Sequence, residues 1–296
     1  MSADARPTIV VGIDGSRDGL LALDWAVDLA MRRSWGIRAV HVADDDQPAH
    51  PLGATPDIDD GAEVLEDAAD ELAELGFTDA TLEVRNGHPA EVLLDVARSA
   101  ALLVIGRRGR GGFAELSLGS ISQVCTALSR TSLVVVPDNW THDEGDLGVV
   151  VVGVDGSQAC QAALGFAFEV AAERRAELTI VHVPRVPEDS PPPSVWVDPD
   201  NAPWRQDARA LVTHALAGWP DKYADVVFRT HYQPGHPVQV LAQYSKAVDL
   251  VVVGGVGRSE FTPLRLGSVS RGLLHHTHCP VAIIHTEATI GPGRPA

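Results

Sequence analysis

Short apolar runs alternate with longer amphipathic stretches along the first half of this chain. Runs rich in Val, Leu and Ile at residues 9–13 and 101–105 have the length and composition of buried strands. The stretch after the first run places Leu20, Leu23 and Val27 on one face of a helix. Strands that alternate with helices of about 10 to 15 residues predict βαβ units, and therefore a parallel sheet with helices on both faces.

The second half of the chain repeats this order of elements. The acidic segment 138–146 separates the halves, so we predict two α/β domains in tandem, at residues 1–140 and 147–290. In each half we expect five strands and the helices between them: strands at 9–13 and 149–154, strands ending at Val42 and Val183, strands at 80–85 and 225–230, helices opening at Pro89 and Pro237, strands at 101–105 and 249–253, helices opening at Ser120 and Ser268, and last strands "SLVVVP" and "PVAIIH".

Two quoted motifs measure the repeat. "TIVVGIDGS" ends at Ser16 and "VVVVGVDGS" at Ser157, an offset of 141 residues. "NGHPAEVL" around His88 returns as "PGHPVQVL" around His236, an offset of 148 residues. We expect part of this difference of seven residues to lie in the proline-rich segment that starts at Pro184. A repeat of this length indicates a duplicated domain and excludes a solenoid.

Composition narrows the classes of protein that this chain can belong to. The net charge of −17 disfavours binding to nucleic acid or to anionic membranes. Three widely spaced cysteines form no disulfide framework, which is typical of a reducing compartment. There is no signal-peptide pattern, and no apolar run reaches the length of about 18 residues that indicates a membrane span. We expect a cytoplasmic protein that does not insert into membranes.

A glycine-rich segment with the same spacing follows the fourth expected strand of each half. Glycine lets backbone N–H groups approach a ligand closely, and the helix that starts after the segment favours an anion at its N-terminus. Arg107, Arg108 and Arg110 add positive charge in an acidic chain. The segment matches neither the P-loop nor the dinucleotide fingerprint, and its alternative interpretation is a surface turn before a capped helix. The two copies are Gly106-x2-Gly109-x9-Gly119-Ser120 and Gly254-x2-Gly257-x9-Gly267-Ser268.

An aspartate ends the first expected strand of each half, as Asp14 and Asp155. Each stands in an Asp-Gly-Ser sequence, so capping of the following helix is one role. Ligands of open parallel sheets bind outside the carboxyl ends of the strands, where the strand order reverses. If the first and fourth strands are neighbours there, Asp14 and Gly106 flank one crevice, and Asp14 would orient the base or sugar of a nucleotide.

These motifs resemble the universal stress protein family, in its tandem-domain, ATP-binding form common in actinobacteria. The resemblance covers nearly the whole chain, through "VVGIDGS" and "VVGVDGS", both glycine segments, and "GSVSRGLLHHTHCPVAIIH" with its fainter first-half counterpart. It implies a doubly wound sheet of five parallel strands in the order 3-2-1-4-5 in each half. It also implies that the two halves pair through their last strands and that the chain forms a homodimer.

The resemblance further implies two ATP molecules per chain, with or without Mg²⁺. The glycine segments correspond to triphosphate contacts, and the ends of the first and second strands correspond to adenosine contacts. The implied first-half residues are Gly12, Ile13, Asp14, Val42, Gly106, Arg107, Arg108, Gly109, Arg110, Gly111, Gly112, Gly119, Ser120 and Ile121. The implied second-half residues are Gly153, Val154, Asp155, Val183, Gly254, Gly255, Val256, Gly257, Arg258, Ser259, Gly267, Ser268 and Val269.

Several functions stay open at this level. The favoured one is a regulatory protein of stress adaptation that binds ATP without dedicated turnover, because no catalytic motif accompanies the glycine segments. The alternatives are an ATP-dependent enzyme of a related fold and an interaction module that binds no ligand. "HHTHC", from His275 to Cys279, is too tightly spaced for a tetrahedral metal site, so we expect no metal. With three arginines against Arg258 alone, the first half should bind ATP more tightly than the second.

Overall fold

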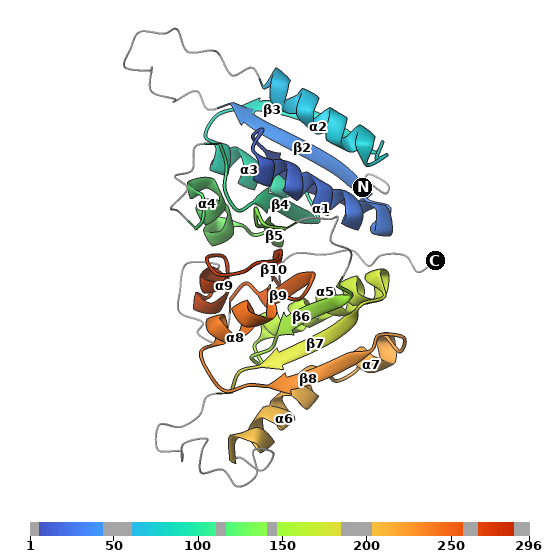
Figure 1. The fold of residues 1–296 in the computed structure, drawn as a ribbon, viewed down its shortest axis with the longest axis vertical. Coiled ribbons are helices and arrows are strands. Elements are labelled where there is room, and N and C mark those ends of the chain that lie inside the picture. The colour runs from blue at the N-terminus through green and yellow to red at the C-terminus, as the bar shows by residue number, and fades with distance from the viewer. Residues whose placement is uncertain are drawn as a thin grey trace. The chain divides into compact units, whose positions relative to one another are not determined.

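The computed structural model describes residues 6–43, 61–110, 117–140, 147–184, 203–256 and 266–286. The chain divides into two compact units, and the division falls between Trp140 and Leu147 among these residues. Each unit contains its own sheet and its own covering helices (Figure 1).

The first unit is built on five parallel strands in the order β3-β2-β1-β4-β5. This confirms the predicted fold class and the reversal of strand order between β1 and β4. Apolar side chains cover both faces, as expected for strands enclosed by helices. The strands are β1 (Thr8–Ile13), β2 (Gly36–Ala43), β3 (Ala80–Asn86), β4 (Leu102–Gly106) and β5 (Leu133–Val136).

Four helices cover the two faces of this sheet. Helix α1 packs beside α2, and α3 packs beside α4 (Figure 1). Helix α1 begins where expected because the Ser16 hydroxyl accepts a hydrogen bond from the Gly19 N–H at 3.2 Å. Trp25 of α1 is completely buried against the sheet. The helices are α1 (Arg17–Arg33), α2 (Ala62–Glu74), α3 (Pro89–Ala97) and α4 (Ser120–Leu128).

The second unit has the same architecture, with parallel strands in the order β8-β7-β6-β9-β10. Ser157 caps α5 as Ser16 caps α1, through the N–H of Cys160 at 3.2 Å. The strands are β6 (Val149–Gly153), β7 (Glu177–His182), β8 (Phe228–Tyr232), β9 (Leu250–Gly254) and β10 (Val281–Ile284). The helices are α5 (Gln158–Arg174), α6 (Pro203–Ala215), α7 (Trp219–Lys222), α8 (Pro237–Tyr244) and α9 (Ser268–Leu273).

The seven additional residues of the second unit lie between α6 and β8. The offset between the units is still 141 residues at the ends of α2 and α6, Glu74 and Ala215. It is 148 residues at the starts of β3 and β8, Ala80 and Phe228. The expectation that the proline-rich segment carries part of the difference is therefore wrong. The additional residues include α7, which has no counterpart in the first unit.

Helix α7 is held against α5 by aromatic packing. The Trp219 ring stacks on Phe168 with ring centroids 5.9 Å apart, and its Nε1–H donates to the Gln161 Oε1 atom at 3.3 Å. Gly165 leaves room for this ring, because a Cβ atom there would come within 2.7 Å of it. The insertion is thus a packed element of the second unit.

The three cysteines are buried and unpaired by disulfides. Burial raises the pKa of the Cys125 thiol to about 12 and also raises the pKa values of Cys160 and Cys279. They are therefore core residues without nucleophilic character. In the part of the chain that the structure describes, none of the helices combines the length and the apolar character needed to span a membrane.

Candidate nucleotide site

The carboxyl ends of β1 and β4 lie side by side in the first unit, with Gly12 in register with Ile105. As a result, Asp14 and the residues after Gly106 approach each other closely. The Asp14 carboxylate accepts hydrogen bonds from the backbone N–H of Ser16 at 3.0 Å and of Arg110 at 2.9 Å. The crevice inferred from the sequence therefore joins residues that are 96 positions apart in the chain.

Glycine at positions 106 and 109 permits this approach. A Cβ atom at Gly106 would lie 2.7 Å from the backbone carbonyl of Asp18, at the start of α1. A Cβ atom at Gly109 would collide with the Asp14 carboxylate. Both glycines thus allow the segment after β4 to lie directly against α1.

The segment then leads into α4 in a fixed geometry. The Gly119 N–H donates to the Arg107 carbonyl at 2.9 Å, and the Ser122 hydroxyl donates to the Gly106 carbonyl at 2.8 Å. Gly119 has the extended backbone of an N-cap residue, and Ser120, the first residue of α4, is exposed. Ser120 is therefore able to reach a ligand at this edge of the sheet.

Two of the three first-unit arginines are engaged with Asp138, which follows β5. Arg107 Nη2 lies 2.5 Å from one Asp138 oxygen, and Arg108 forms an ion pair with the other. Since β5 borders β4 on the side away from β1, these guanidinium groups point away from the crevice. The third, Arg110, lies against Gly15, where a Cβ atom would come within 2.9 Å of its Cζ atom.

Sequence reasoning missed Asp18, which contacts the same segment from α1. Its carboxylate accepts the Arg108 N–H at 2.9 Å, and the residue is only 7% exposed. Burial raises the pKa of this carboxyl, while the backbone hydrogen bond and the charges of Arg108 and Arg107 act in the opposite direction and Asp14 reinforces the rise. Its position in the second unit is held by Ala159, and that difference was the available signal.

The raised pKa of Asp18 predicts a pH-dependent gain in stability for Asp18→Asn. With a folded-state pKa above the unfolded value, the carboxyl stabilises the fold fully only below the unfolded pKa, and this contribution is lost as the pH rises through the folded pKa. An asparagine can still accept the Arg108 N–H. Calorimetric scans should therefore give Asp18→Asn a higher Tm than the wild type near neutral pH, with the gap closing towards about pH 4. The same gap at both pH values would contradict this reasoning.

The adenosine side of the first crevice is lined by the ends of β1 and β2. Val42 is 9% exposed, and its neighbour His41 is buried with Nδ1 3.1 Å from the Ile13 carbonyl oxygen. At Gly12 a side chain would press on Leu93 of α3, at 3.1 Å. The structure therefore brings Gly12, Ile13 and Val42 to one edge, as the sequence predicts.

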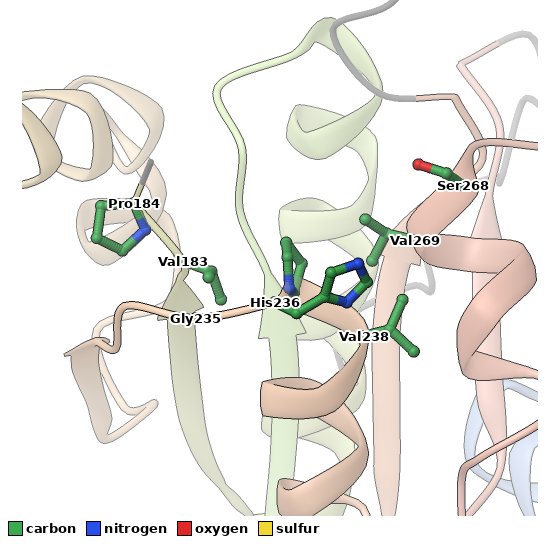
Figure 2. Close-up of a pocket in the computed structure, with 8 residues that line it drawn as sticks. Val183, Pro184, Gly235, His236, Val238, Ser268 and Val269 are labelled. Carbon is green, nitrogen blue, oxygen red and sulfur yellow. The ribbon is translucent and has the colours of Figure 1, made fainter. Parts of the chain in front are cut away.

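The second unit contains a cleft of about 600 Å³ at the corresponding edge (Figure 2). Val183, Ser268 and Val269, predicted from the sequence, line it. The imidazole of His236 lies beside Val238 and Val269 in Figure 2, although the sequence favoured only a helix-entry role for this histidine. The repeated Gly-His-Pro motif was the signal that could have identified it. The lining consists of Val183, Pro184, Gly235, His236, Pro237, Val238, Ser268 and Val269.

The remaining second-unit contacts repeat those of the first. Asp155 accepts the Ser157 N–H at 2.9 Å, and His182 Nδ1 lies 2.7 Å from the Val154 carbonyl oxygen. The Gly267 N–H donates to the Gly255 carbonyl at 2.6 Å. Gly153 ends β6, Gly254 ends β9 and Val256 follows shortly after it. Among the predicted residues, Gly111, Gly112, Gly257, Arg258 and Ser259 lie outside the described residues.

A model of the universal stress protein family matches residues 6–137 and 148–285. The chain belongs to the universal stress protein family. A universal stress protein of Mycolicibacterium smegmatis is 32% identical over 288 residues, which cover 93% of this chain and 96% of that protein. One from Mycobacterium tuberculosis is 30% identical with the same coverage. The crystal structure of a universal stress protein from Archaeoglobus fulgidus, 20% identical, superimposes with a TM-score of 0.67 over 94% of this chain and 96% of that one, and shows the shared fold.

The two halves of this universal stress protein differ in the groups that surround the glycine segment. Arg107, Arg108, Asp18 and Asp138 of the first half correspond to Gly255, Val256, Ala159 and Thr286 of the second. The charged cluster of the first unit is therefore absent from the described part of the second. Within the described residues, no group of three or more His, Cys, Asp or Glu side chains is placed to hold a metal ion.

Proposed function

We propose that this universal stress protein binds adenine nucleotides, one ATP per half, and that occupancy regulates its interactions during stress adaptation. The observation that carries the proposal is the second-unit cleft at the edge where β7, α8 and α9 meet. Its volume of about 600 Å³ is in the range of small-molecule sites. Val183 and Val269 offer apolar surface to a base, and Ser268 offers a hydroxyl to a phosphate.

The first half supports the same ligand through the convergence of Asp14, Val42 and Ser120 at one edge. Asp14 lies next to the glycine segment, and its free lone pairs are directed by two backbone N–H groups. This carboxylate is occupied in holding the segment, so we assign it a positioning role and not that of a general base. Binding without evolved turnover follows, with Mg²⁺ as an optional companion of the nucleotide. Pairing of the halves through their last strands, a homodimer and a cytoplasmic location stay predictions.

The test is a calorimetric titration of ATP into the full chain and into Val269→Trp. A tryptophan at this position fills the second cleft, so stoichiometry should fall from about two ATP per chain to about one. Val227→Trp is the matched control, because Val227 is 64% exposed and precedes β8 at the opposite end of its strand. It should keep the wild-type stoichiometry. No heat of binding in the wild type would favour an interaction module, and rapid ATP consumption would favour an enzyme.

A further inference from the structure

We propose that Asp18 and Asp138 are selectivity residues that weaken the binding of polyphosphates in the first half. Their carboxylates hold the groups of the glycine segment that a nucleotide phosphate would otherwise use. This inference rests on the proposed function and concerns how the first half ranks adenosine, AMP, ADP and ATP.

Asp18 occupies a backbone donor. Its carboxylate accepts the Arg108 N–H at 2.9 Å, in the relation that a phosphate oxygen would have to this group. The close approach of Gly106 to the start of α1 fixes the carboxylate in place, and the residue is 7% exposed. A phosphate that binds here must displace a buried anion that is part of the fold.

Asp138 occupies the two guanidinium groups. Both arginines pair with it, and the side chains are largely shielded from solvent, with exposures of 15% for Arg107, 26% for Arg108 and 30% for Asp138. Shielded, charge-assisted contacts are stronger than exposed ion pairs. The arginines are held towards β5, on the side of β4 away from β1 and the crevice.

The charges of this cluster cancel. Two arginines face two carboxylates, and Asp14 adds a further negative charge at the crevice. A triphosphate therefore meets no net positive charge from the cluster, whereas uncharged adenosine is unaffected by it. The expectation that three arginines make the first half the tighter ATP site loses its basis, since two of them are neutralised within the fold.

The test uses Val269→Trp as the background, so that the first half alone is observed. Adenosine, AMP, ADP and ATP are titrated into this protein with and without Asp138→Thr, which installs the second-half residue. We expect ATP affinity to rise about tenfold, the equivalent of one charge-assisted contact. ADP should gain less, and adenosine should be unchanged. Asp138→Asn, which keeps the shape and removes the charge, should act in the same direction, as should Asp18→Ala.

Asp95→Thr is the matched control for the loss of one negative charge. Asp95 is 75% exposed on α3 and pairs only loosely with Arg98, at 3.6 Å. It should leave the ratio of ATP to adenosine affinity unchanged. If Asp138→Thr and Asp138→Asn leave that ratio unchanged or lower it while ATP still binds, the selectivity role is wrong and the proposed function stands. If no protein, the wild type included, binds any of the four ligands, both proposals fail.

Discussion

Replacement of Phe168 by alanine should destabilise the second unit by about 3 to 5 kcal/mol. Phe168 is completely buried in α5. Its ring lies 5.9 Å from that of Trp219, 5.7 Å from that of Tyr223 and 6.0 Å from that of Phe228, measured between centroids. Its removal leaves a cavity beneath the inserted helix α7, and the stacking of Trp219 and Tyr223 is lost as well.

The measurement is urea unfolding followed by tryptophan fluorescence. Because the chain has two units, the transitions are fitted separately and not as one two-state process. Val227→Ala is the matched control, since this side chain is 64% exposed and should change the free energy of unfolding by less than about 0.5 kcal/mol. A loss below about 1 kcal/mol for Phe168→Ala would show that α7 is not anchored through this ring.

The second large effect is expected for Gly106→Ala. The added methyl group would lie 2.7 Å from the backbone carbonyl carbon and oxygen of Asp18, so either β4 or the start of α1 must shift. Overpacking of this kind costs about 1 to 3 kcal/mol, and the upper end applies because backbone atoms cannot rotate away. The shift also separates Asp14 from the glycine segment, so nucleotide binding in the first half should be lost.

Gly36→Ala provides the comparison for Gly106→Ala. Gly36 starts β2, and the nearest atom to an added Cβ there is 3.6 Å away, an ordinary contact. Thermal unfolding should give this variant the wild-type Tm or a slightly higher one, since alanine loses less conformational entropy than glycine on folding. Equal Tm values for the two alanine variants would mean that the close approach of Gly106 to α1 is not required.

The repeated pattern was sufficient to predict most of the fold, because strand length, helix caps and glycine positions are local properties. Ser16 and Ser157 cap helices as expected, and Ser120 and Ser268 begin them. The start of β8 was placed three residues early, at Asp225. The reason is a turn after α7, in which the Val226 N–H donates to the Tyr223 carbonyl at 3.1 Å and delays the strand.

The ion pairs of the site could not be predicted in the same way. The hydrogen bond from Arg108 to Asp18 joins residues 90 positions apart, and nothing in local sequence distinguishes this aspartate from a solvated one in the first turn of a helix. Asp138 was assigned to an acidic segment between domains for the same reason. His236 was judged by its place before a proline, whereas its contribution to the cleft depends on α9, which lies far along the chain.

The most direct test of nucleotide binding is mass spectrometry of the freshly purified full chain, under native conditions and then after denaturation to identify what is released. We expect a chain with added mass that saturates at two ATP molecules when ATP is supplied, and one fewer in Val269→Trp. A chain that carries no nucleotide and gains none at saturating ATP would contradict the proposal that these crevices are nucleotide sites.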